Sequence, residues 1–331
     1  MTRLCSSCVL PETFPGMELD SSGVCSHCRA ALAGDAGPEQ KNRYREKFEA
    51  LAGRFRGADY DVLAAFSGGK DSTFTLDIFK NRFGLRVLAL TFDNGFLSPY
   101  SVKNITRVVE TLGIDHIMYK PNFQLLKKLF TISAGENLFA KKSLERASSI
   151  CSACMHLVKL LILKIALEKK IPFIGYGWSP GQVPMQSSVM KVSAEFIKAT
   201  QNILFNALNG KLGDAVNLFF LDSAQLAGAK HSMYNIYPLA FLEYDEHKIY
   251  QRIRELGWEP PQDTDSNSTN CLLNAFAIEI HQKAYGFHPY AFEIAGLVRR
   301  GVLSREEGIK RLNTPGNAEV IRMVKERLGL A

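Results

Sequence analysis

The sequence predicts an α/β fold in which helices cover both faces of a parallel sheet. Short apolar runs typical of buried strands alternate with stretches of helical spacing, and this alternation favours parallel strands joined by helices. The strand runs are residues 60–66, 85–92, 114–120 and 171–177. In addition, cysteine pairs crowd the N-terminus, and the pattern after about residue 190 is mostly helical. We therefore expect a small cysteine-rich module before the sheet domain and a helical region after it.

Composition sets the broad class. The chain has 331 residues, of which 46% are hydrophobic, and it can bury a large core. No apolar run reaches the roughly 18–20 residues that span a bilayer, and residues 1–16 lack a signal-peptide core. We therefore expect a cytoplasmic protein without a membrane partner. In the cytoplasm, paired cysteines indicate metal or redox chemistry rather than disulfides. The net charge of +7 is compatible with a polyanionic partner such as RNA or a nucleotide.

Four segments follow from the order of elements. Residues 1–33 have little periodicity, residues 34–58 contain a charged helix, residues 59–240 carry the alternating strands and helices, and residues 241–331 are helical. Within the sheet domain we expect helices over 72–84, 98–113 and about 153–169. Later helical patterns cover 193–208, 244–258, 271–286, 289–301 and 304–313. The polar stretch 259–270 is an expected loop that leads Cys271 to the start of a helix.

The N-terminal cysteines form two C-x2-C pairs, Cys5 with Cys8 and Cys25 with Cys28. The sixteen residues between the pairs fall within zinc-ribbon spacing. Four thiolates suit a tetrahedral structural zinc ion, and metal binding supplies folding free energy to a module too small for a core. We predict a Zn²⁺ site here. His27 lies inside the second pair, but four cysteines already fill the site.

A glycine-rich turn follows the first strand, in the stretch "AFSGGKDST" (65–73). Gly68 and Gly69 allow the backbone to approach an anion, and a helix beginning near Asp71 offers free N–H groups. Lys70 adds a cation. The spacing is not that of a Walker A loop. Phe66 and the hydroxyls of Ser67 and Ser72 complete the predicted phosphate loop.

This stretch resembles the SGGxDS loop of the PP-loop ATP pyrophosphatases, with a complete match over residues 67–72. The resemblance implies a HUP-like sheet domain and a loop that grips the pyrophosphate of ATP while the α-phosphate is attacked. It also implies adenosine contacts at the end of the next strand, where Thr91, Asp93 and Asn94 lie. Asp71 or Asp93 is a candidate for holding Mg²⁺. Gly175 stands where the family often has a Gly-His contact, although the histidine is replaced by tyrosine here.

Three cysteines remain, namely Cys151, Cys154 and Cys271. Three thiolates leave one coordination position open, which suits a [4Fe–4S] cluster with one free iron. A second interpretation is redox chemistry, with a persulfide on one cysteine and a resolving cysteine beside it. In the third, the pair packs in the core and Cys271 is an ordinary buried thiol.

Residues 151–177 resemble the C-x-x-C helix and next strand of PP-loop tRNA thiolation enzymes, in particular the cluster-dependent 2-thiouridine synthetases. The resemblance implies that Cys151, Cys154 and Cys271 ligate a [4Fe–4S] cluster whose open iron holds sulfide. This sequence lacks the second zinc knuckle of some tRNA thiolases between the phosphate loop and the C-terminus.

Both ends of the chain resemble PP-loop N-acetyl sugar amidotransferases, at residues 5–28 and 285–312. Those enzymes act on a nucleotide-linked sugar with ammonia from a separate glutaminase. The expected reaction is therefore adenylylation of an acceptor, either a tRNA base or a nucleotide-linked sugar, followed by displacement of AMP. We expect sulfide as the nucleophile and a sulfur donor as partner, with ammonia and a glutaminase as the alternative.

Two further expectations concern partners. A non-catalytic nucleotide- or RNA-binding module is a different class that the zinc ribbon and the positive charge also suit. Related enzymes are often dimers, so a homodimer is compatible with the resemblance. Candidates for stacking on a base are aromatic residues near the strand ends, and candidates for phosphate contacts lie in the tail: Phe92, Phe96, Tyr176, Trp178, Arg299 and Arg300.

Overall fold

Six strands form one sheet at the centre of the molecule, with strand order β3-β2-β1-β4-β6-β5. The computed structural model describes residues 2–32, 37–55, 59–136, 138–208, 210–227, 232–265 and 267–330. The strands are β1 (Val62–Ala65), β2 (Val87–Phe92), β3 (Asp115–Tyr119), β4 (Phe173–Tyr176), β5 (Val189–Val192) and β6 (Met233–Ile236). Neighbours pair in parallel except β5 and β6, which are antiparallel.

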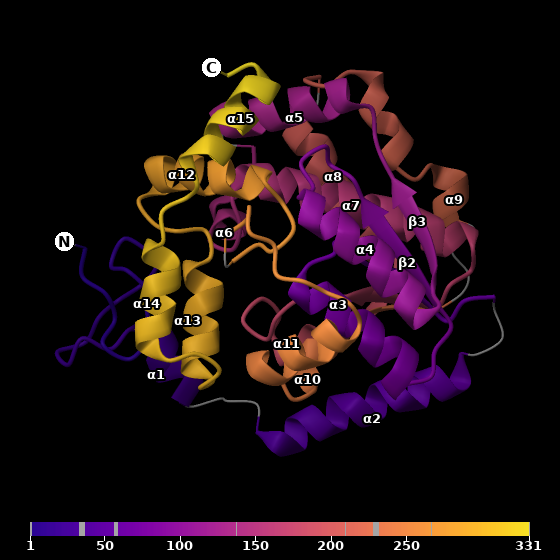
Figure 1. Ribbon diagram of the computed structural model, residues 1–331, viewed down its shortest axis with the longest axis horizontal. Helices are drawn as coiled ribbons and strands as arrows, with labels where there is room; N and C mark the ends of the chain where they lie inside the picture. Colours follow the sequence, from indigo (N-terminus) through magenta and orange to yellow (C-terminus); the bar gives the residue numbers. More distant parts are fainter. Residues whose placement is uncertain are drawn as a thin grey trace.

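Helices occupy most of the rest of the described chain (Figure 1). Those up to β4 are α1 (Ser26–Leu32), α2 (Pro38–Arg54), α3 (Lys70–Asp77), the π-helical turn η1 (Ile78–Arg82), α4 (Pro99–Leu112), α5 (Phe123–Gly135), α6 (Lys141–Leu144) and α7 (Ser149–Glu168). Those after β4 are η2 (Met185–Ser187), α8 (Ala194–Leu208), η3 (Asp214–Phe219), α9 (Ser223–Ala227), α10 (Pro238–Phe241), α11 (Glu246–Glu255), α12 (Leu273–Tyr285), α13 (Ala291–Arg299), α14 (Arg305–Asn313) and α15 (Ala318–Leu328).

The sheet is buried on both faces, which confirms the predicted α/β class. Successive side chains of a strand point to opposite faces. Val62 and Ala64 of β1 accordingly pack with α3, α4 and α11, whereas Leu63 packs with α5, α7 and α8. This two-sided burial explains why the strands read as continuous apolar runs rather than as alternating patterns.

The four predicted strands are present, but the sequence did not reveal β5 and β6. Both have four residues and lie in the region predicted to be mostly helical. They extend the sheet beyond β4. Strand β6 pairs with β4 in parallel, and β5 pairs with β6 in the antiparallel direction at the edge of the sheet. The prediction of a mainly helical region after residue 190 was therefore incomplete.

The expectation that no apolar segment could span a bilayer was wrong for one helix. Helix α7 has 20 residues and is long and apolar enough to do so by length and composition. Half of its apolar window is buried in the fold, and the helix packs against α5, α8 and α12. Its apolar character is therefore that of a core helix.

The chain reverses direction across the sheet between β1 and β4. From β1 it proceeds outward through β2 to β3, and it then returns to the other side of β1 as β4. In open α/β sheets, ligands bind outside the carboxyl ends of the strands at such a switch point. The glycine-rich turn follows β1, and residues 177–184 follow β4, so both segments border this crevice.

The N-terminal module packs against the C-terminal helices, and Figure 1 shows α1 beside α13 and α14. Phe14 stacks with Phe292 and meets Phe287 edge-on at 5.1 Å between ring centroids. Arg305 donates to the carbonyl oxygens of Cys5 and Cys8. The two ends of the chain thus share one core. The predicted segment boundaries at residues 33/34 and 58 lie outside the described residues.

Candidate active site

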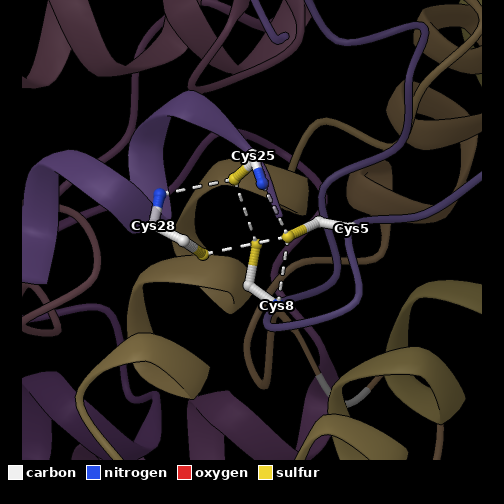
Figure 2. Close-up of side chains that lie close together, drawn as sticks. All are labelled: Cys5, Cys8, Cys25 and Cys28. Carbon is white, nitrogen blue, oxygen red and sulfur yellow. Dashed lines mark hydrogen bonds between the residues drawn. The ribbon is translucent and has the colours of Figure 1, made fainter. Parts of the chain in front are cut away.

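The four N-terminal cysteines converge as the spacing predicts (Figure 2). Their sulfur atoms all lie within 4.8 Å of one another, with Cys5 and Cys28 Sγ 3.9 Å apart and Cys8 and Cys25 Sγ 3.8 Å apart. A tetrahedral zinc ion with Zn–S bonds of about 2.3 Å places its sulfurs about 3.8 Å apart. The backbone N–H groups of Cys8 and Cys25 donate to Cys5 Sγ. These residues fit a structural zinc ion, and its identity as zinc stays a prediction.

The phosphate loop lies between β1 and α3, and Gly68 is essential to its shape. Gly68 has φ of +76°, and a Cβ there would lie 2.7 Å from the carbonyl oxygen of Ser101. The Ser67 and Ser72 hydroxyls are 3.1 Å apart, and Ser72 Oγ donates to the carbonyl of Gly69. The turn is therefore braced by its own serines at the start of a helix, where anions bind readily.

Segments far along the chain hold the loop from outside. The indole of Trp258 donates to the carbonyl of Gly68 at 2.9 Å, and Thr269 Oγ1 accepts from the backbone N–H of Lys70 at 3.1 Å. A Cβ on Gly177 would lie 2.6 Å from Ser72 Cα, so the end of β4 packs directly on the first turn of α3. An anion that uses the Lys70 N–H must displace the Thr269 hydroxyl.

A cavity of about 220 Å³ opens at this edge of the sheet, at the ends of β1, β2 and β4. It joins the phosphate loop to the cysteine helix. Its lining includes Phe66, Ser67 and Ser72 from the loop region, Asn94 after β2, Cys154 and Lys159 from α7, and Tyr176, Gly177 and Trp178 at the end of β4. A ligand seated on the loop would therefore lie in the same cavity as a thiol.

The other two cysteines lie close to Cys154. The Asn94 side-chain amide donates to Cys154 Sγ at 3.7 Å and to Cys271 Sγ at 3.4 Å, so the two sulfurs are no farther apart than the sum of these distances. Cys151 Sγ donates to Asn274 Oδ1 at 3.8 Å. All three cysteine residues are partly buried. Cys271 lines a neighbouring cavity of about 530 Å³ beside α14. The predicted gathering from two distant parts of the chain is therefore present.

The spacing of this trio differs from that of a single-ion site. In the part of the chain that the structure describes, only the N-terminal cysteines bring three or more ligand atoms within 4.8 Å of one another. At least one pair among Cys151, Cys154 and Cys271 is thus farther apart than 4.8 Å. A four-iron cube is wider than one ion and takes thiolate ligands. Sulfurs at this wider spacing fit such a cluster.

Burial raises the pKa of all three thiols, that of Cys151 to about 12. The Coulomb repulsion of Cys271 adds to the rise at Cys151 and Cys154. Protonated thiols are weak nucleophiles and weak ligands, and a bound cationic group releases their protons. The environment therefore disfavours free thiolates and favours thiolates that are coordinated.

The Lys70 side chain, predicted to contact pyrophosphate, is engaged by neighbouring side chains in this structure. Its ammonium donates to Glu246 Oε1 and to the Tyr244 hydroxyl, both at 2.7 Å, and lies 3.2 Å from Asp71 Oδ1. Tyr244 also donates to Asp71. The physical reason is that the first turn of α3 faces α11, where Glu246 begins the helix. The ammonium is thus neutralised by protein carboxylates, and Lys70 does not line the cavity in the described structure.

Three other predicted residues support the site instead of lining it. The Thr91 hydroxyl donates to the carbonyl of Phe66 at 2.6 Å and is fully buried. Asp93 accepts from the backbone of Gly95 and pairs with Lys120. A Cβ on Gly175 would lie 2.2 Å from the ring of Phe79, so this glycine serves sheet–helix packing rather than nucleotide contact.

Lys159 is the residue that sequence reasoning missed. It is the one lysine or arginine among the described residues that line the cavity, and its ammonium lies 4.8 Å from the centroid of the Trp178 ring. Burial lowers its pKa to about 8. The sequence could have revealed Lys159 through its helical spacing, because residues 151, 155 and 159 fall on one face of α7. The role of Gly177 at the cavity was also missed, because Gly175, two residues earlier, stands where PP-loop enzymes often have a Gly-His contact.

Comparisons with known proteins give limited similarity. No family model matches the chain. It is 24% identical over 329 residues to MJ1599, an uncharacterized protein of Methanocaldococcus jannaschii, and the match covers 98% of this chain and 99% of that protein.

Among solved structures, the U34-tRNA thiolase NcsA from Methanococcus maripaludis, with its [4Fe-4S] cluster, is 18% identical with a TM-score of 0.38, covering 91% of this chain and 87% of the other. NMN synthetase from Francisella tularensis is 11% identical with a TM-score of 0.42, covering 90% and 98%. NH3-dependent NAD synthetase from Campylobacter jejuni is 13% identical with a TM-score of 0.38, covering 88% and 93%. At these scores, the functional argument rests on the geometry of the site itself.

Proposed function

We propose that this protein is an ATP-dependent enzyme that adenylylates an acceptor and then transfers sulfur to it. One observation carries the proposal. The cavity that borders the phosphate loop at Ser67 and Ser72 also contains Cys154, and Asn94 links Cys154 to Cys271. A binding module has no use for a group of thiols beside a nucleotide loop, whereas a transferase needs the two to be adjacent.

The proposed reaction has two steps. An oxygen of the acceptor attacks the α-phosphorus of ATP, the bond to the pyrophosphate breaks, and pyrophosphate leaves with the bonding electrons. A sulfur nucleophile that a sulfide donor supplies then attacks the activated carbon, and AMP leaves with the acceptor oxygen. The acceptor is either a tRNA base or a nucleotide-linked sugar.

The chain's own residues support the first step by electrostatics. The N-terminus of α3 and the amides of the loop face the position of the leaving pyrophosphate. Lys159 supplies a positive charge at the cavity, where its burial strengthens its electrostatic interactions. The Trp178 ring beneath it fixes its position. Carboxylates near the loop, such as Asp71, are candidates for holding the Mg²⁺ that accompanies ATP.

Cys151, Cys154 and Cys271 would hold a [4Fe–4S] cluster. When bound, the cluster supplies the sulfur-transfer chemistry, because one of its irons has no protein ligand. Asn94 donates to two of the three sulfurs, and such hydrogen bonds tune a cluster and orient its ligands.

Anaerobic metal and acid-labile sulfide analysis tests the proposal. We expect about four irons and one zinc per chain in the wild-type protein. Cys271→Ala should lose the iron and sulfide and retain the zinc, and Cys25→Ala should lose zinc and retain iron. A colourless anaerobic preparation that holds zinc alone would overturn the cluster and favour ammonia or a persulfide as the nucleophile.

Pyrophosphate release tests the enzymatic claim separately. Release from ATP should depend on an acceptor, with unfractionated tRNA and a UDP-linked N-acetyl sugar as the two candidates. Lys159→Met should slow this release on the order of 10²-fold, because a charge that stabilises the leaving group is lost. If neither acceptor stimulates release from anaerobically loaded protein, the adenylylating function is contradicted.

A further inference from the structure

A polar pocket of about 230 Å³ lies among α5, α7 and α12, and α7 packs against both of the other helices. Its polar lining includes Ser133 of α5, Ser149 at the start of α7 and His281 of α12. The described residues that line this pocket are all different from those that line the active-site cavity. The proposed reaction therefore gives the pocket no role.

Three buried side chains of this pocket lack a hydrogen-bond partner in the described structure. Ser133 and His281 are each 1% exposed and Ser149 is 8% exposed, yet the two hydroxyls and both ring nitrogens of the histidine are unpaired there. Leaving a buried polar group unpaired costs about 1–3 kcal/mol, and buried polar groups in folded proteins are almost always paired. Three such groups around one pocket therefore indicate a polar occupant.

The start of α7 adds backbone donors to the same pocket. Ser148, which is the N-cap of this helix, lines the pocket together with Ser149 and Ile150. Ser148 Oγ accepts from the N–H of Cys151, whereas the N–H groups of Ser149 and Ile150 have no acceptor within the helix because they belong to its first turn. The dipole of this 20-residue helix favours negative charge at the same end.

The titratable groups at the pocket are compatible with an anion. Glu136 is the one carboxylate among the described lining residues, and it already forms an ion pair with Lys211. Burial lowers the pKa of His281 to about 4, so its ring is neutral at pH 7 and offers one N–H donor. The rings of Tyr285 and Phe287 pack on this imidazole, with centroids 4.7 Å and 4.9 Å from its own, and hold it in place.

An oxyanion matches this set of groups. Two hydroxyls, an imidazole N–H and the N–H groups of a helix start can all donate, and an oxyanion presents three or four acceptor oxygens to them. A cation would instead meet the positive end of the helix dipole.

We propose that the pocket of Ser133, Ser149 and His281 binds a small oxyanion at the N-terminus of α7. Inorganic phosphate, sulfate and thiosulfate share this chemistry, and thiosulfate in addition carries a sulfur atom. Ser149 lies two residues before Cys151, so the bound oxyanion fixes the start of the helix that carries two of the three thiols. Such a site exists whether or not the protein transfers sulfur.

Nuclear magnetic resonance of the histidine side chains tests the site directly. The chain has seven histidines, and after labelling with nitrogen-15 histidine the His281 signal is the one that His281→Gln removes. Sodium phosphate, sodium sulfate and sodium thiosulfate are each titrated at constant ionic strength, with sodium chloride as the reference. We expect a saturable shift of the His281 signal with at least one oxyanion and no saturable shift with chloride.

Single hydroxyl deletions show whether the pocket itself binds the oxyanion. Ser133→Ala and Ser149→Ala should each weaken binding about tenfold or more, because each removes a hydrogen bond to a charged group. Thr75→Val is the matched control. It removes a hydroxyl that is also buried and unpaired in the described structure, but in α3 and outside the pocket, and the affinity should not change.

The proposal is overturned if no oxyanion gives a saturable shift, since the pocket then holds only water. It is also overturned if the two serine variants bind as the wild-type protein does, or if Thr75→Val weakens binding as much as they do. Preferential binding of thiosulfate would link the site to a sulfur donor, and preferential binding of phosphate or sulfate would separate it from sulfur transfer. The assay needs neither iron nor catalysis, so its failure and the failure of pyrophosphate release are distinguishable.

Discussion

Gly68 shows how one residue determines the phosphate loop. Its positive φ favours glycine, and the space where a Cβ would lie is already occupied by the Ser101 carbonyl and the Ile105 side chain. The sequence predicted the need for glycine from the motif. It could not predict the crowding, because Ser101 and Ile105 belong to α4, on the other side of β2 in sequence.

Gly68→Ala should therefore cost more stability than backbone strain alone. Gly84→Ala is the matched control, because Gly84 also has positive φ (+58°) but has no atom near the position of a Cβ. Strain in this region costs about 1–3 kcal/mol, so we expect Gly84→Ala to lose about 1 kcal/mol and Gly68→Ala clearly more. Urea unfolding measures both. Equal losses would show that the close packing of α4 on the loop has no energetic role.

Lys159 links burial to nucleotide binding through its pKa, which burial lowers to about 8 from 10.5. The unfolded chain therefore binds more protons than the folded one between these values, and stability rises as the pH increases through this window. A phosphate in the cavity would favour the charged form and raise the pKa again. ATP binding should then take up protons near pH 8 to 9.

Calorimetry in buffers of different ionisation enthalpy measures this proton uptake. Lys159→Met should abolish it, and Lys159→Arg should also abolish it while keeping the positive charge and most of the affinity. Proton uptake that persists in Lys159→Met would assign the titration to another group and remove Lys159 from the nucleotide site.

At the scale of elements, α3, α11 and α14 are joined by charges that no local pattern reveals. Glu246 at the start of α11 accepts from Lys70 of α3 and from Arg311 of α14, each at 2.7 Å. Burial raises the pKa of Glu246, but its ionic partners outweigh this effect and lower it to about 2. The stability from this carboxylate is present above its ordinary pKa near 4.5 and is lost as the pH falls toward 2.

Glu246→Gln should destabilise the protein by about 3 kcal/mol, because two largely buried cations lose the carboxylate that they share. Glu243→Gln is the control, since Glu243 pairs with Lys248 on the surface and such exposed pairs contribute about 0–1 kcal/mol. The free energies of unfolding at pH 7 and pH 3 decide the matter. The difference between the two variants should be smaller at pH 3 than at pH 7, because part of the Glu246 contribution is lost below pH 4.5, and similar losses at pH 7 would contradict a buried network.

Sequence reasoning found those elements whose signals are local. It predicted β1 to β4 from apolar runs and the phosphate loop from its motif. It also predicted α7, but the helix begins four residues earlier than expected, at Ser149, with Ser148 as its N-cap. The strands β5 and β6 are four residues each, too short for a periodic signal, and β6 is specified by its pairing with β4. The pairing of Lys70 with Glu246 could not be predicted from local sequence, because Glu246 lies 176 residues away.

At the scale of the whole molecule, the two ends of the chain complete the sheet domain. Cys271 reaches the thiols of α7 because Leu97 and Cys271 form a β-bridge and Leu272 donates to the Phe96 carbonyl. The N-terminal module in turn packs against α13 and α14. The structure thus couples the four-cysteine site to these two helices.

Zinc removal should therefore loosen more than the N-terminal module. After treatment with a zinc-selective chelator such as TPEN, we expect faster amide hydrogen exchange in residues 4–32 and also in α13 and α14. The reason is that Arg305 donates to the carbonyls of Cys5 and Cys8, and Phe14 packs on Phe287 and Phe292. The strands β1, β2 and β4 should keep their protection, because one face of each strand packs in a second core, with α5, α7 and α8, that contains none of the N-terminal cysteines. TPEN that has been saturated with Zn²⁺ beforehand serves as the control, because it cannot remove the metal ion from the protein. Exchange that rises in residues 4–32 alone would show that the module is an independent attachment rather than a support for the C-terminal helices.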